Sequence, residues 1–160
     1  MVDLPLQSDC LRLFGNPSSP GWLAKNTTRV PVPWKMTMGD IPIKSIVINK
    51  IAAESLASVL NAIWQRCGQS QSKIHFAGCD CFSGSFAVRP IRGGHTPSKH
   101  SYALAIDINA PANPLGADAA HTLFQSDSIV VEEFKKAGWV WGGDWAGRRD
   151  AMHMQFARVG

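Results

Sequence analysis

A histidine and an aspartate, His100 and Asp107, stand seven residues apart in the segment PSKHSYALAIDIN (97–109). A zinc site that performs hydrolysis takes three ligands from His, Asp, Glu or Cys and leaves a position open for water. On an extended chain, residues at this spacing lie on the order of 20 Å apart. They can therefore share a metal only if the chain turns sharply between them, for example through a helical turn at KHSYA (99–103). Taken alone, Asp107 could equally cap the turn that follows it.

A third candidate ligand, His153, lies in the run DAMHMQF (150–156) near the end of the sequence. If this run is a strand, alternation places its methionines and Phe156 on one face and His153 with Gln155 on the other. Asp150 precedes His153 by three residues, so its carboxylate could serve as a general base toward water at a metal.

Each of these residues also has an ordinary explanation. A lone histidine is more often a surface or core residue than a ligand, and this is the expectation for His75, His95 and His121. Asp150 alone could be a solvated loop charge. The residue types and their spacing therefore suggest a zinc site without establishing one.

The elements that must position these residues are mixed helices and strands. Helices are predicted over 51–66, where apolar residues recur at helical spacing, and over 127–137, with Asp127 as N-cap and Gly138 after its end. Strands are predicted at 44–50, 73–82, 84–91 and 103–109, and GWVWGGDW (138–145) and AMHMQFARV (151–159) are strand-like. Because strands and helices are mixed along the sequence without a regular βαβ repeat, the α+β class is favoured over a doubly wound sheet.

The length of 160 residues predicts one domain, residues 1–160. Residues 1–42 are rich in Pro, Gly, Ser and Asn and are predicted to form an irregular N-terminal arm, anchored by Trp22 and Trp34, beside a core of residues 43–160. The net charge of +4 favours anionic partners. Nucleic acid is not expected, because Arg148 and Arg149 form the only adjacent pair of arginines.

The N-terminal sequence has no basic start followed by a long apolar run, so no secretory signal and no membrane insertion are expected. Synthesis in the cytoplasm and a monomeric state are the corresponding expectations. Four cysteines are too few for a disulfide scaffold. Cys79 and Cys81 are expected to be small half-buried residues, and a single bridge from Cys67 to one of them is the open alternative.

The two blocks together resemble a known family. SKHSYALAID (98–107) resembles the Ser-x-His-x-x-Gly-x-Ala-x-Asp signature of the zinc D,D-carboxypeptidase and L-alanyl-D-glutamate endopeptidase family, the VanY/VanX-type peptidases. WGGDW and DAMHMQF (141–156) resemble its second block, and VRPIRGG (88–94) resembles the arginine-bearing segment before the first. The layout is closest to the phage endolysin branch. The resemblance implies a small α+β fold with a central antiparallel sheet, shared with the hedgehog signalling domain.

By this resemblance His100, Asp107 and His153 are the zinc ligands, and Asp150 is the catalytic base. The implied reaction is zinc-assisted hydrolysis of an amide bond, with Zn2+ as the cofactor. The implied substrate is the stem peptide of bacterial peptidoglycan, which suits a basic protein because the wall is acidic. The bond that is cut stays open between the two activities of the family.

Other residues also match positions of the family, but the roles that the resemblance implies for them are less specific. Arg89 matches the arginine that holds substrate and stabilises charge on the attacked carbonyl, and Arg92 is its rival. Ser98 is expected to bind substrate or to support the first ligand. The family glycine is Ala103 here, so a positive φ at this position would strain the bend.

The implied biological role is that of a phage endolysin or another wall-lytic enzyme, released by a holin or carried in the virion. The alternative is a non-catalytic wall-binding or virion morphogenesis module on the same fold. A pure binding module has no need for Asp150, so the intact set of ligands and base favours the enzyme.

Overall fold

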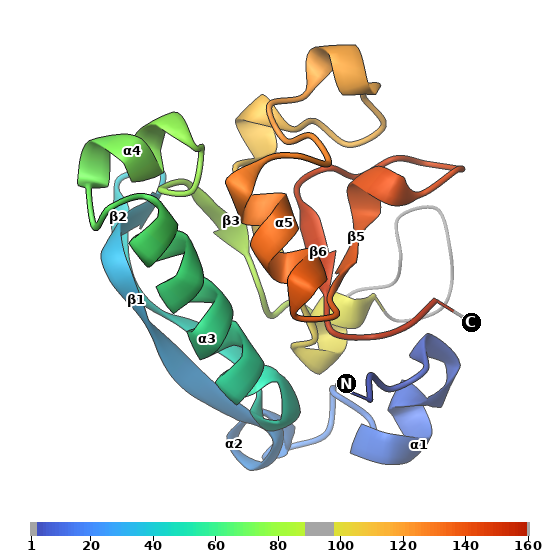
Figure 1. Ribbon diagram of the computed structural model, residues 1–160. Coiled ribbons are helices and arrows are strands. Elements are labelled where there is room, and N and C mark those ends of the chain that lie inside the picture. Colours follow the sequence, from blue (N-terminus) through green and yellow to red (C-terminus); the bar gives the residue numbers. More distant parts are fainter. Residues whose placement is uncertain (1–2, 89–97, 160) are drawn as a thin grey trace.

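Helices and strands are mixed along the chain, in a computed structural model that describes residues 3–88 and 98–159 (Figure 1). The α-helices among these residues are α1 (Cys10–Phe14), α2 (Trp22–Asn26), α3 (Lys50–Arg66), α4 (Gln71–Phe76) and α5 (Ile129–Lys136). The strands are β1 (Thr27–Met38), β2 (Ile41–Asn49), β3 (Phe82–Gly84), β4 (Ala105–Ile108), β5 (Val140–Trp141) and β6 (His153–Gln155). Short 3-10 turns are formed by Gln7–Asp9, Lys99–Tyr102, Ala110–Ala112, Ala119–His121 and Gly142–Asp144.

The strands form two antiparallel sheets. β1 and β2 make a two-stranded ribbon, and the other four strands make a sheet in the order β3-β4-β6-β5. The prediction of one small α+β domain with antiparallel pairing is confirmed. The four-stranded sheet is short, and its two central strands are the ones that carry Asp107 and His153.

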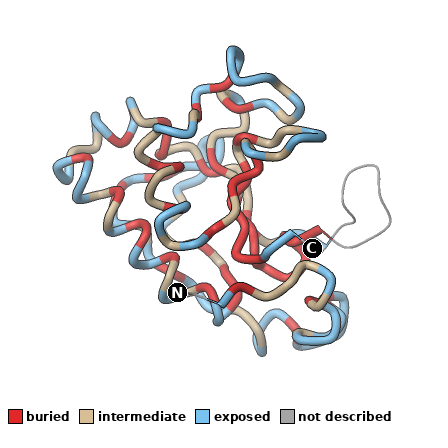
Figure 2. Tube along the Cα trace, turned by 45° about the vertical axis from the view of Figure 1, so that its right-hand side comes forward, coloured by how far each residue is buried: buried red, intermediate tan, exposed pale blue. Residues whose placement is uncertain are grey.

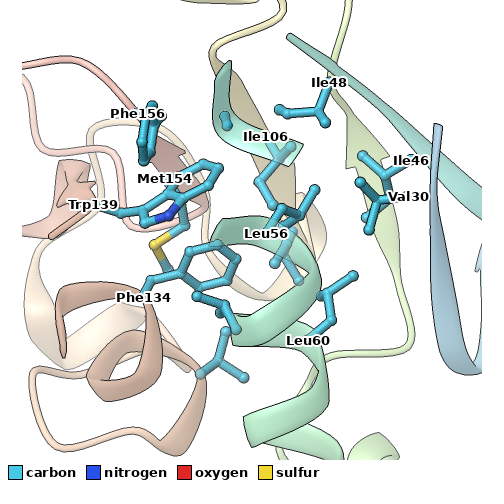
Figure 3. Packing of buried hydrophobic residues seen from close by; sticks show 14 of the residues in the cluster. Val30, Ile46, Ile48, Leu56, Leu60, Ile106, Phe134, Trp139, Met154 and Phe156 are labelled. Carbon is cyan, nitrogen blue, oxygen red and sulfur yellow. The ribbon is translucent and has the colours of Figure 1, made fainter. Parts of the chain in front are cut away.

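Helix α3 lies between the ribbon and the rest of the domain. Its apolar face is fully buried and contacts both β1 and α5, as the periodicity over 51–66 predicts. Figure 3 shows Leu56 and Leu60 of α3 between the ribbon residue Val30 and the side chains of Ile106 and Phe134. Buried residues gather toward the middle of the molecule, whereas the outer loops are exposed (Figure 2). This core packs against the face of the four-stranded sheet that carries Ile106 and Met154.

The N-terminal part of the chain is more regular than predicted. Residues 27–38 form the long strand β1, not an irregular arm, despite Pro31 and Pro33. Proline is tolerated there because the two prolines lie at or inside the stretch between Pro31 and Met36 where the register of the β1–β2 pair shifts. Trp22 and Trp34 are buried, as expected, and the Trp34 Nε1 donates a hydrogen bond to the carbonyl of Cys79 at 2.8 Å.

Three other expectations differ from the structure. Residues 71–76 form helix α4 instead of a strand, because the Ser70 side chain caps it by accepting from the Lys73 amide. The segment from Ser85 to residue 88 is not a strand, and residues 89–91 lie outside the described residues. Helix α5 begins one residue later than expected, with Ser128 rather than Asp127 at the N-cap position.

All four cysteines are free, so the alternative of a bridge from Cys67 to Cys79 or Cys81 is wrong. Cys79 is fully buried, and Cys81 is half-buried. Among the residues that the structure describes, no helix is both long and apolar enough to cross a membrane.

Candidate active site

A tight turn brings His100 back toward Asp107. The 3-10 turn Lys99–Tyr102 ends at Ala103, whose φ of 52° and ψ of 38° are left-handed, and β4 follows immediately. The Asn49 amide donates to the Ala103 carbonyl at 2.7 Å, and the Asn49 side chain donates to the Tyr102 carbonyl at 3.1 Å. This turn is the reversal that the sequence required, and it leaves Nε2 of His100 3.2 Å from Oδ2 of Asp107.

His153 reaches the same place from the neighbouring strand. Asp107 on β4 and His153 on β6 are register partners in the antiparallel pair. Nδ1 of His153 lies 3.1 Å from Oδ1 of Asp107. One ligand atom each from His100, Asp107 and His153 lies within 4.8 Å of the others. Residues from two separate segments of the sequence thus form one group of side chains, as predicted.

Hydrogen bonds fix which nitrogen of His100 is available. Nδ1 of His100 lies 2.9 Å from the carbonyl oxygen of Ser85, which can only accept, so Nδ1 carries the proton. The lone pair of Nε2 therefore faces Asp107, and this buried atom makes no hydrogen bond with another described residue. Sequence reasoning missed Ser85, since only the folded chain brings it to His100.

The electrostatics of the group favour a bound cation. Burial alone would raise the pKa of Asp107, but the imidazoles of His100 and His153 outweigh it and hold that pKa well below its usual range. Burial alone would lower the pKa of His153, but the Asp107 carboxylate outweighs it and raises that pKa. The carboxylate is thus ionised at neutral pH and lies between two imidazoles.

The donor set fits a catalytic zinc ion. Two imidazoles and one carboxylate are a three-ligand set of the kind that leaves a fourth position for water or substrate. The group opens onto a cavity of about 410 Å³, whose walls include Trp145, Arg148 and Met152. The unpartnered Nε2 of His100 is the nitrogen that a metal would use. The chain thus offers a candidate metal site that opens onto a cavity.

Asp150 lies on the wall of the same cavity. Its carbonyl accepts from the His153 amide at 3.2 Å in a tight turn, and its own amide donates to the Gly142 carbonyl at 2.9 Å. A Cβ at Gly142 would collide with the Asp150 carbonyl oxygen, so glycine is required for this approach. The predicted base therefore lies beside the third ligand, and its catalytic role stays a prediction.

The remaining predicted residues have different outcomes. Ser98 lines the cavity, and its Oγ accepts from the His100 amide at 3.2 Å, which supports the first ligand. Arg89 and Arg92 lie outside the described residues. Arg148, an exposed cation on the cavity wall, makes no hydrogen bond or ion pair with another described residue.

Comparison with known proteins agrees with this geometry. Residues 92–156 match a family model described as D-alanyl-D-alanine carboxypeptidase. The matched segment contains all three candidate ligands and Asp150. No curated protein and no solved structure matches the chain. The match supports the zinc D,D-peptidase family that the sequence resembles and points to a metallopeptidase.

Proposed function

We propose that this chain is a zinc-dependent peptidase that hydrolyses an amide bond in the stem peptide of bacterial peptidoglycan. The observation that carries the proposal is the buried group His100, Asp107 and His153, which opens onto a cavity with Asp150 on its wall. The family match over 92–156 supports the peptidase class. The basic net charge of +4 suits an acidic polymer as substrate.

The residues have separable roles in this reaction. His100, Asp107 and His153 would hold the zinc ion, which would supply Lewis acidity for the activation of water and of the amide carbonyl. Asp150 accepts a proton from the attacking water and delivers it to the leaving amine as the carbon–nitrogen bond breaks. The products are a carboxylate and an amine. Stabilisation of the oxyanion by Arg89 stays part of the proposal.

Two bonds of the stem peptide are candidates for the bond that is hydrolysed. The family-model description favours the terminal D-alanyl-D-alanine bond, and the resemblance in the sequence also includes the L-alanyl-D-glutamate bond. Mass spectrometry of the products from defined muropeptides distinguishes them. Release of free D-alanine indicates the carboxypeptidase, and release of a peptide that begins with D-glutamate indicates the endopeptidase.

The proposal extends to a lytic role outside the cytoplasm. A monomeric enzyme of the phage endolysin type would be made in the cytoplasm and would reach the wall through a holin, or would act as a virion component. Expression in a bacterial host with and without a holin tests the first route. Lysis that depends on the holin supports it, and lysis without one contradicts it.

The direct test of the chemistry compares two aspartates. Asp150→Asn should lower kcat by roughly 10²- to 10⁴-fold, because the base is lost while the zinc ligands remain. Asp144→Asn is the matched control, since Asp144 pairs with Lys135 at 2.8 Å and is not a lining residue of the cavity. Equal activity of the two variants on defined muropeptides would contradict the assignment of the base.

A further inference from the structure

The N-terminal segment lies against the chain that follows β6. Leu6 forms a parallel bridge with Arg158, and the Gln7 amide donates to the Arg158 carbonyl at 2.8 Å. In return, the Arg158 amide donates to the Pro5 carbonyl at 2.8 Å, and its side chain donates to the Leu4 carbonyl at 3.1 Å. The N-terminal segment is thus fixed beside the chain that directly follows β6, the strand with the third candidate zinc ligand (Figure 1).

Gln7 in this segment contacts both ligand-bearing parts of the site. Its Oε1 accepts from Nε2 of Gln155 at 3.2 Å, and Gln155 is two residues from His153 on β6. Its backbone carbonyl accepts from Nζ of the buried Lys99 at 3.1 Å, and Lys99 directly precedes His100. Gln7 therefore contacts both the residue before His100 and the residue beside His153 on β6.

The orientation of the Gln155 amide follows from its partners. Its Nε2 lies 2.9 Å from the carbonyl of Ala157, which can only accept, and the second hydrogen is directed at Gln7. The amide oxygen must then be the atom that lies 2.9 Å from Nε2 of His153. Gln155 is 1% exposed, so water does not compete for these bonds.

This arrangement sets the state of the third ligand. An amide oxygen only accepts, so Nε2 of His153 must carry a proton, and whenever the imidazole is neutral the lone pair of Nδ1 faces Asp107 and His100. A neutral imidazole can bind a metal through one nitrogen only, and the tautomer decides which. The opposite tautomer would place an N–H where the metal belongs.

We infer that Gln155, held in orientation by Gln7, is a positioning residue that fixes His153 in the tautomer required for zinc binding. The N-terminal segment then contributes to zinc binding through Gln7, although it lies outside the matched residues 92–156. The inference rests on the proposed zinc chemistry. Loss of an outer partner of a metal-bound histidine typically weakens metal binding by roughly 10- to 100-fold.

The test measures zinc affinity of the full-length, metal-stripped protein by competition with a chelator. Gln155→Met should weaken binding roughly 10- to 100-fold, because methionine fills similar space without an amide oxygen. Gln7→Met should cause a smaller loss, since the Ala157 contact still orients Gln155. The control is Gln71→Met, which removes two hydrogen bonds to Lys35 away from the metal group.

A second readout separates positioning from simple stability. Nitrogen-15 NMR of the metal-free protein, recorded at a pH above the raised pKa of His153 so that the ring is neutral, should show the Nε2–H tautomer in the wild type and its loss in Gln155→Met. Gln155→Glu keeps an oxygen acceptor and should restore this tautomer in part. A wild-type His153 protonated at Nδ1 in its neutral form would overturn the inference, even if Gln155→Met fails to fold.

The outcomes also distinguish this inference from the proposed function. A wild-type protein that binds no zinc contradicts the proposed function, and the NMR result then still decides whether Gln155 sets the tautomer. Stoichiometric zinc binding that is unchanged within twofold in Gln155→Met overturns the positioning role and leaves the peptidase proposal intact.

Discussion

Asp107 lies directly opposite His153 on adjacent antiparallel strands, with 3.1 Å between its Oδ1 and Nδ1 of the imidazole. The register of β4 and β6 therefore brings together two of the three members of the candidate metal group. A slip of one residue would turn one of these side chains to the other face of the sheet. The third member, His100, arrives through the tight turn before β4. The site thus depends on backbone geometry as much as on the identity of its ligands.

Replacing the central candidate ligand should weaken zinc binding strongly. Asp107→Asn removes the charge that lies between two imidazoles while it keeps the shape of the side chain. Zinc affinity should fall by more than the roughly 10- to 100-fold that loss of an outer partner costs. Asp118→Asn is the matched control, because it breaks a pair with the exposed His121 outside the metal group. Isothermal titration with zinc measures both variants, and equal affinities would contradict the ligand assignment.

The left-handed residue Ala103 predicts an unequal response to two substitutions. Ala103→Val places a β-branched side chain at φ 52° in a fully buried position, and should lower the free energy of unfolding by roughly 2 kcal/mol or more. Ala103→Gly should be close to neutral. It relieves about 1–2 kcal/mol of left-handed strain, but loses about 0.8 kcal/mol of buried methyl and adds about 0.4–1 kcal/mol of unfolded-state entropy.

Urea denaturation of the metal-free variants measures both differences. An Ala103→Val protein as stable as the wild type would show that the turn is not left-handed. A gain of several kcal/mol in Ala103→Gly would show that the strain is larger than this balance allows.

Zinc affinity should depend on pH near neutrality. Burial lowers the pKa of His153, but Asp107 outweighs it, so this pKa lies above its ordinary value of about 6.5. Zinc binds the unprotonated imidazole, so its apparent affinity should fall as the pH falls through the raised pKa, by about tenfold per unit for one proton.

The stability of the metal-free protein should change in the opposite direction. A raised pKa in the folded state stabilises the fold below the ordinary pKa of histidine, and this contribution is lost as the pH rises through the raised value. Chelator competition and urea denaturation at several pH values measure the two trends. Parallel trends in affinity and stability would contradict the pairing of His153 with Asp107.

Arg148 should contribute to substrate binding through its free charge. It lines the cavity without an ion-pair partner among the described residues, and stem peptides carry carboxylates. Arg148→Ala should raise KM by roughly 3- to 10-fold with a smaller change in kcat, because an exposed pair is worth about 1 kcal/mol. Arg29→Ala, on the ribbon and away from the cavity, is the control. An unchanged KM in Arg148→Ala would exclude this role.

The order and spacing of the candidate ligands could be read from the sequence because each lies in a short local pattern. His100 and Asp107 lie within one segment, and the alternation around His153 predicts which face it shares with Gln155. The helix over 51–66 follows from its apolar periodicity for the same reason. The resemblance to the family, which has glycine where this chain has Ala103, pointed to a possible positive φ there, and the structure shows it.

The features that the sequence could not predict depend on long-range contacts. The strand β1 contains two prolines, and only its pairing with β2 shows the register shift that accommodates them. The contact between Gln7 and Gln155 joins residues 148 positions apart, and no local pattern indicates it. The contact of Ser85 with His100 is likewise created by folding.

The proposed reaction requires zinc held by His100, Asp107 and His153 for hydrolysis of the stem peptide. The most direct measurement is cleavage of defined muropeptides by the purified protein before and after chelation, with the metal content determined in the same samples. We expect about one zinc per chain, loss of cleavage on removal of the metal, and recovery on its return. Cleavage that persists in metal-free protein would contradict it.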